Sequence, residues 1–198
     1  MNMYLHGANN PKLERINTLG DGPHAERRYD VIFANPPYGG KIDNIRDNFT
    51  ISTNKTELLF LQHIIQTLKE GGRAGVILPE GVMFQSGAAQ KIREILLSQC
   101  ETFTVVSMPA GVFQPYTGVK TDLLFFKKGT GTQKVWFFDV KNDGFDLGSQ
   151  RRPIKQDDLP MLWDKFPFKG ENDFTPPKSE KELAKAESEK SWWADLEE

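Results

Sequence analysis

The feature that most constrains the fold of this chain is a short apolar segment that runs directly into two adjacent prolines. Residues 29–34 read YDVIFA, and β-branched and aromatic residues in such a run favour a strand buried on both faces. The residues that follow are Asn35, Pro36, Pro37, Tyr38, Gly39 and Gly40. Proline has no N–H to give to a strand ladder, so the strand must end there. The sequence therefore predicts a buried strand whose carboxyl end presents the Asn35–Tyr38 turn.

The chain beyond this turn alternates between helix and strand patterns. Apolar residues recur at helical spacing between residues 56 and 70, and Ser86 is a possible cap for a second helix that runs to about residue 98. Residues 73–78 and 103–108 are predicted strands, and residues 121–127 and 134–140 are predicted to pair as a hairpin. We therefore predict an α/β fold with a Rossmann-like sheet that is mostly parallel and has a C-terminal antiparallel hairpin.

The pattern weakens after Val140, which divides the chain into three predicted ranges. Residues 1–140 are a partial catalytic domain, residues 141–177 an irregular extension, and residues 178–198 a charged helical tail. Ser179 and Glu182 have capping-box spacing at the start of that tail. Trp192 and Trp193 at its end suggest docking on a partner, whereas the charged residues before them are typical of a solvated face.

Charge and cysteine content exclude several classes of protein. Lys and Arg number 25 and Asp and Glu 27, so the net charge of −2 excludes a strongly basic nucleic-acid coat and offers no attraction to a membrane surface. No apolar run has the length of a membrane span, and the start lacks a signal-peptide layout. The single cysteine, Cys100, fits a reducing compartment, so we expect a cytoplasmic protein. The three histidines show no metal-binding spacing, so no metal site is expected.

The Asn35–Tyr38 turn suits chemistry on the exocyclic amine of a nucleobase. Such an amine is a poor nucleophile, and it is helped by two acceptors that hold both of its N–H bonds. The side-chain oxygen of Asn35 and the carbonyl of Pro36 can be those acceptors, and Pro37 stiffens the turn. Tyr38 offers a flat face on which a flipped base can stack. The alternative is a structural turn that only ends the strand.

With these residues the chain resembles the N6-adenine DNA methyltransferases, and more closely the methylation subunit of type I restriction-modification systems. The resemblance covers about residues 1–160. It is supported by the following segments: Met3–Gly7, Gly20–Asp21, Asp30–Gly39, Gly71–Pro79 and Thr121–Phe126. The family's fold is a doubly wound, S-adenosylmethionine-dependent methyltransferase sheet with a reversed hairpin strand. The resemblance implies methyl transfer from S-adenosylmethionine to a flipped adenine in double-stranded DNA, together with specificity and restriction subunits, and no membrane.

The resemblance also implies roles for single residues. Asn35, Pro36, Pro37 and Tyr38 match the catalytic motif, and Asn35 also lies toward the cofactor. Asp21 matches the acid that holds the adenine of the cofactor, although a plain turn explains Gly20 to Gly22 equally well.

Two further matches leave alternatives open. Phe113 and Tyr116 lie where the family places an aromatic facing the target base, with packing on the sheet as the alternative. Glu57 either contacts the cofactor or is a favourable acid in the first turn of a helix.

One part of the family pattern is missing from this sequence. No glycine-rich loop for the cofactor precedes Tyr29, and the later residues 143–149 are followed by Gln150, Arg151, Arg152 and Pro153 instead of by small residues that open a helix. We therefore expect the C-terminal part of a catalytic domain: a gene fragment, a domain produced on its own, or half of a split enzyme with an N-terminal half in trans. The strand at 29–34 would then present an open apolar edge.

Two other readings compete with this one. The first is a catalytically inactive remnant or an interaction module that binds the partner subunits of a restriction-modification system. The second is methylation of RNA or of a protein glutamine, because the same turn can hold other planar amines.

Overall fold

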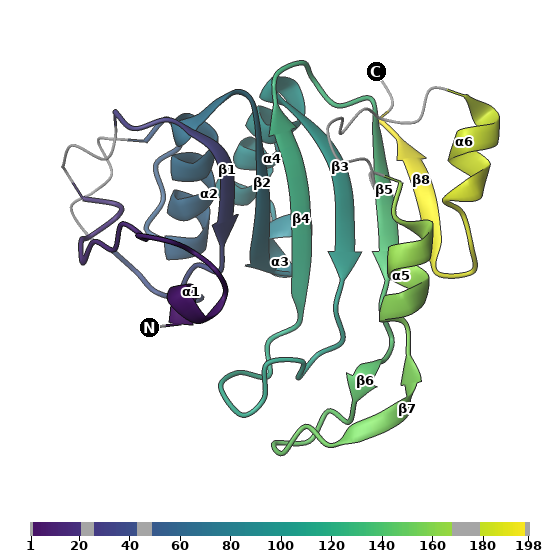
Figure 1. Cartoon of the computed structure of the whole chain (residues 1–198). Coiled ribbons are helices and arrows are strands. Elements are labelled where there is room, and N and C mark those ends of the chain that lie inside the picture. The colour runs from purple at the N-terminus through teal and green to yellow at the C-terminus, as the bar shows by residue number, and fades with distance from the viewer. Residues whose placement is uncertain (1, 21–25, 43–48, 168–178, 197–198) are drawn as a thin grey trace.

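A six-stranded sheet forms the centre of the computed structural model, which describes residues 2–20, 26–42, 49–167 and 179–196 (Figure 1). The strand order is β1–β2–β4–β3–β5–β8, and β6 and β7 form a separate two-stranded ribbon. The strands of the large sheet are β1 (Tyr29–Ala34), β2 (Leu68–Pro79), β3 (Cys100–Ser107), β4 (Thr121–Lys128), β5 (Lys134–Asp139) and β8 (Ser191–Asp195). Those of the ribbon are β6 (Asp143–Phe145) and β7 (Pro153–Asp157).

Helices cover both faces of the large sheet. The helices are α1 (Asn2–Leu5), α2 (Thr56–Thr67), α3 (Gly81–Phe84), α4 (Ala88–Gln99), α5 (Leu159–Lys165) and α6 (Glu180–Lys185). Buried residues of α2 and α4, such as Leu61 and Ile92, form one apolar core with β2 and β4. A second core around Trp136 and Phe138 lies on the other face, with Leu162 of α5 packed against it. No helix among the described residues is long and apolar enough to span a membrane.

Four strands of the large sheet run in the same direction. β1 is parallel to β2 and β3 is parallel to β5, while β4 is antiparallel to both β2 and β3. The carboxyl ends of β1, β2, β3 and β5 therefore meet at one edge, at the bottom of Figure 1. In open α/β sheets this is the edge at which ligands bind.

The Rossmann-like fold is confirmed, but the predicted strand pairing is wrong in two respects. Residues 121–128 and 134–139 do not form a hairpin, because β3 lies between β4 and β5. Three of the five pairings are antiparallel, so the sheet is mixed rather than mostly parallel. The physical reason lies in β4, where Leu124 and Phe126 belong to one core while Leu123 and Phe125 pack against the other. A strand that is apolar on both faces is stabilised by a central position, which a terminal hairpin does not provide.

Strand β1 is less buried than its composition predicts. Val31 is 45% exposed and Phe33 is 80% exposed, because both point to the face of β1 opposite Ile32 and Ala34, which pack against the core that α2 helps to form. The expectation of burial on both faces is therefore wrong. Within the described residues β1 pairs with β2 alone, which agrees with the expected open edge.

The C-terminal range begins as predicted and then departs from the prediction. Ser179 and Glu182 form the capping box at the start of α6. The helix ends at Lys185, however, and Trp192 and Trp193 lie in the strand β8, paired with β5. Stacking of Trp192 on Phe137 at 5.6 Å draws this segment onto the sheet. The division of the chain into three ranges stays a prediction.

Cys100 provides a test of how tightly the core is packed. Its side chain is fully buried, and that burial raises the pKa of the thiol to about 12. Since the thiolate is the reactive form, we expect a disulfide reagent at pH 8 to modify the folded chain at least about 100-fold more slowly than the chain unfolded in urea. The absorbance of the thiolate that the reagent releases measures both rates. Equal rates would show that the core opens around Cys100.

Candidate functional site

The Asn35–Tyr38 turn leaves the carboxyl end of β1 with its side chains organised against each other. The hydroxyl of Tyr38 donates a hydrogen bond of 2.7 Å to Oδ1 of Asn35. Pro36 is buried, whereas Asn35 faces solvent. Partial burial raises the pKa of the Tyr38 hydroxyl, which keeps it a hydrogen-bond donor near neutral pH. The turn therefore presents an exposed amide whose oxygen has one fixed partner.

Two residues at the N-terminus of α2 contact the backbone at the end of the Asn35–Tyr38 turn. Thr56 and Glu57 are both buried and both contact the backbone between Pro37 and Gly40. Sequence reasoning missed Thr56 and left two alternatives for Glu57. The signal that could have found them is a Thr-Glu pair at a helix start that faces the two glycines after the turn.

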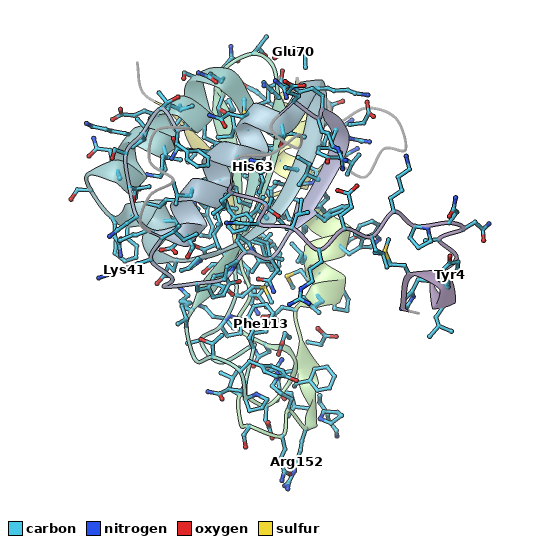
Figure 2. All side chains as sticks on the ribbon, turned by 90° about the vertical axis from the view of Figure 1, so that its left-hand side faces the viewer. Tyr4, Lys41, His63, Glu70, Phe113 and Arg152 are labelled. Carbon is cyan, nitrogen blue, oxygen red and sulfur yellow. The ribbon has the colours of Figure 1, made fainter. Side chains whose placement is uncertain are left out.

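The loop after β3 carries the two predicted aromatics to the same edge of the sheet. Phe113 is half-buried, and Figure 2 shows it beneath the sheet, while Tyr116 is 92% exposed. The loop is held at its base, where the N–H of Glu80 donates to the carbonyl of Lys120 at 3.0 Å and the two side chains form an ion pair. Among the described residues no ring contact or hydrogen bond joins these aromatics to the Asn35–Tyr38 turn.

A buried acid lies at the same edge, at the start of β4. Asp122 is 2% exposed, and burial raises its pKa to about 6, while a hydrogen bond with Ser107 and the nearby Lys120 favour the charged form. The carboxylate of Glu80 acts with burial against that charge. From the sequence alone, Asp122 had no role of its own and was only part of the Thr121–Phe126 segment that supports the family resemblance.

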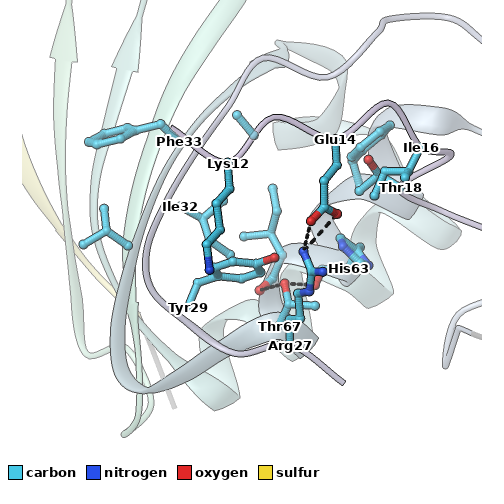
Figure 3. Close-up of a pocket in the computed structure, with 14 residues that line it drawn as sticks. Lys12, Glu14, Ile16, Thr18, Arg27, Tyr29, Ile32, Phe33, His63 and Thr67 are labelled. Atoms are coloured by element: carbon cyan, nitrogen blue, oxygen red, sulfur yellow. Dashed lines mark hydrogen bonds and ion pairs between the residues drawn. The ribbon is translucent and has the colours of Figure 1, made fainter. Parts of the chain in front are cut away.

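A cavity of about 770 Å³ runs along the free side of β1 (Figure 3). Residues 12–18 form one wall, and β1 and α2 form the others. Glu14 and Arg27 pair across its rim at 3.0 Å, with Lys12 and His63 nearby, while Tyr29 and Phe33 supply apolar surface. No group of three or more metal-binding side chains is found in the part of the chain that the structure describes.

The structure bears differently on Asp21 and on residues 143–149, the two segments that sequence analysis considered for the cofactor. Asp21 lies outside the described residues, so its predicted role stays a prediction. Residues 143–149 do not open a helix, because Asp143–Phe145 is the strand β6, which pairs with β7. This segment therefore lacks the helix start that follows a glycine-rich cofactor loop.

Comparison with known proteins finds close relatives. The family model described as N-6 DNA Methylase matches residues 1–198. The methylase subunit of the type I restriction enzyme EcoEI of Escherichia coli is 43% identical over 160 residues, which are 78% of this chain and 33% of that subunit.

Solved structures agree with this match. A chain from a study of complex assembly and conformational transition in the type I restriction-modification system has a TM-score of 0.81 at 36% identity, over 98% of this chain and 40% of that one. The M protein of the type I restriction enzyme EcoKI has a TM-score of 0.67 at 32% identity, over 83% of this chain and 35% of that one. The chain thus spans less than half the length of each of these relatives.

Replacement of Asp122 by asparagine tests the energetic cost of its burial. The folded pKa of about 6 lies above the ordinary value of 3.8, so the folded chain holds a proton that the unfolded chain has released between these pH values. The contribution of the protonated Asp122 side chain to the free energy of unfolding is therefore fully present below about pH 4 and is lost as the pH rises through 6. We expect D122N to raise the free energy of unfolding at pH 7 by up to about 3 kcal/mol.

Urea unfolding at pH 5 and pH 7 measures this effect. The wild-type chain should lose stability between these pH values, and D122N should lose less. The matched variant D30N, at an exposed aspartate of β1, should show no gain at pH 7. An unchanged pH dependence in D122N would contradict the assignment.

Proposed function

Because the chain belongs to the N-6 DNA methylase family, we propose that it is the part of a type I methylase subunit that holds an adenine for methylation at N6. The observation that carries this proposal is the Asn35–Tyr38 turn at the carboxyl end of β1, with the Asn35 amide exposed and fixed by Tyr38. The substrate is double-stranded DNA, and the cofactor is S-adenosylmethionine.

The two acceptors of the turn explain how the amine is activated. Oδ1 of Asn35 has two lone pairs, so it can accept from the Tyr38 hydroxyl and from the target amine at once. The carbonyl of Pro36 takes the second N–H of the amine. Both contacts favour a tetrahedral nitrogen, and they are fixed before the base arrives, so little reorganisation is needed during transfer. S-adenosylmethionine supplies an electrophilic methyl group when it is bound.

Aromatic side chains are proposed to hold the flipped base. Tyr38 stacks on the base from the turn, and Phe113 and Tyr116 approach from the loop after β3. Stacking contributes about 1–3 kcal/mol per base, which offsets part of the cost of extruding the adenine from the duplex. The high exposure of Tyr116 supports this role, because a ring that packed on the sheet would be covered.

Other segments of a methylase subunit are proposed to complete the cofactor site. Support comes from β1, whose free side carries the exposed Val31 and Phe33 next to Asn35. An N-terminal half with the glycine-rich loop, in trans or in the same polypeptide, would pair with this edge. Asp21 would then hold the adenine of the cofactor and Asn35 would lie near its methyl group. The specificity and restriction subunits are the further proposed partners.

Methyl transfer to DNA tests the proposed activity directly. The chain, supplied with the N-terminal half and the specificity subunit, is incubated with tritiated S-adenosylmethionine and duplex DNA. We expect label in DNA, and a loss of at least about 100-fold in rate for N35A, because a preorganised polar contact to the reacting group is removed.

The controls separate the competing readings. Q99A, at an exposed glutamine directly before β3 and therefore at the opposite edge of the sheet, should keep the wild-type rate. Label in RNA or in protein instead of DNA would contradict the substrate. No label in any of the three with all partners present would favour the inactive remnant.

Calorimetric titration tests whether other segments complete the cofactor site. We expect no heat when the chain alone is titrated with S-adenosylmethionine at high micromolar concentration, because the proposed glycine-rich loop is supplied elsewhere. Clear one-to-one binding that is lost in D21A would show that this chain closes the pocket without help.

A further inference from the structure

The backbone after the Asn35–Tyr38 turn is bound to the first turn of α2 by several hydrogen bonds. Oγ1 of Thr56 lies 3.2 Å from the carbonyl oxygen of Pro37 and 3.1 Å from that of Gly40. The backbone N–H of Thr56 donates to the same Gly40 carbonyl at 3.1 Å. The carboxylate of Glu57 accepts the N–H of Gly39 at 3.3 Å. These bonds join residues that are 16 or more positions apart in the sequence.

The contact is close and is hidden from solvent. Thr56 is 5% exposed and Glu57 is 8% exposed, while Asn35 faces outward. A Cβ on Gly40 would lie 2.7 Å from Oγ1 of Thr56, so a larger residue there would push the two segments apart. Gly39 has a φ of +67°, a conformation that side chains other than glycine rarely adopt. Two glycines in a row are flexible by themselves, so their shape here depends on α2.

We propose that Thr56 and Glu57 are positioning residues that set the geometry of the Asn35–Tyr38 turn through the backbone of Pro37–Gly40. Neither side chain has to touch the base or the cofactor for this role. The hydroxyl of Thr56 has one proton, and its acceptors within reach are the carbonyls of Pro37 and Gly40 and, at 3.4 Å, Oε2 of Glu57. The same Oε2 accepts the N–H of Gly39. The consequence for methylation rests on the proposed function, but the positioning itself does not.

The geometry matters because the amine must meet two acceptors at once. A displacement of about 1 Å can reduce the rate of an oriented reaction by about 100-fold. The Asn35 side chain and the Pro36 carbonyl belong to the same short turn, so a shift at Pro37 moves both. Support from a buried helix terminus therefore keeps the acceptors in place while the exposed side of the turn stays open to a ligand.

The Tyr38 ring gives a readout that does not depend on activity. The chain has four tyrosines, so ¹³C labelling at Cζ gives few signals, and Y38F identifies that of Tyr38. In T56V, which keeps the shape of the side chain and removes the hydroxyl, we expect the pKa of Tyr38 to fall toward its ordinary value as the turn loosens. T56S keeps the hydroxyl and should retain the wild-type titration. Glu57→Ala is the second variant, should T56V not fold.

A matched variant separates positioning from general stability. Thr67 is also buried, at the other end of α2, and its Oγ1 donates to the carbonyl of His63 at 2.8 Å. T67V should lower the melting temperature without changing the titration of Tyr38. If T56V and T67V alter Tyr38 equally, or if neither alters it, the proposal is wrong.

The methylation assay then tests the consequence of this positioning. With all partners present, T56V should lower kcat by about 10- to 100-fold with little change in KM for DNA, and T56S should restore it. Wild-type kcat in T56V would overturn the positioning role. Absence of methylation in the wild-type assembly would refute the proposed function alone, since the Tyr38 titration still decides the positioning.

Discussion

Strand β4 runs between β2 and β3 and is hydrogen-bonded to both, so the two halves of the sheet are joined through it. On one side lie β1 and β2 with their helix α2, and on the other lie β3, β5 and β8. Because β4 is antiparallel to both β2 and β3, these two strands run in the same direction, and so do their parallel partners β1 and β5. Their carboxyl ends consequently share one edge, which is where the polar turn, the aromatic loop and the buried Asp122 are found.

The proposed acceptors at this edge are neutral groups on a backbone turn that is held by hydrogen bonds, and they are not charged side chains. Asn35 and the Pro36 carbonyl are neutral, and dipoles that are fixed in advance would suffice for the proposed methyl transfer, which depends mainly on orientation. The burial of Thr56 and Glu57 beneath an exposed turn fits this scheme. The net charge of −2 is not that of a strongly basic protein, so the long-range attraction of the proposed DNA substrate would need a local basic patch or a basic partner subunit.

The side of β1 that faces away from β2 contrasts with the edge that carries the turn, because within the described residues no strand pairs with it. In an isolated domain the unpaired backbone groups on this side of β1 would form a template for another strand, and the exposed Val31 and Phe33 beside the cavity would add to the risk of aggregation. The pairing of Glu14 with Arg27 across the rim places charges at the margin of this surface without covering it. Completion of the sheet and completion of the cofactor site would therefore be the same event, since both occur next to Asn35.

Local patterns in the sequence were enough to predict the Asn35–Tyr38 turn, the family, and two helices, which we expected over residues 56–70 and from Ser86 to about residue 98 and which the structure places at Thr56–Thr67 and Ala88–Gln99. Each of these depends on spacing within a short window, such as two prolines after an apolar run. Such patterns do not say which strands are neighbours, so the central place of β4 and the attachment of Trp192 through β8 came only from the tertiary structure.

The same limit applies to the candidate site. The bond between Tyr38 and Asn35 and the support from Thr56 and Glu57 depend on how the chain folds back on itself. The raised pKa of Asp122 depends on burial by neighbours from other strands. The sequence by itself determined which groups form the Asn35–Tyr38 turn, because residue type and local order specify that turn. Only the tertiary structure decided how those groups are held, because their partners are distant along the chain.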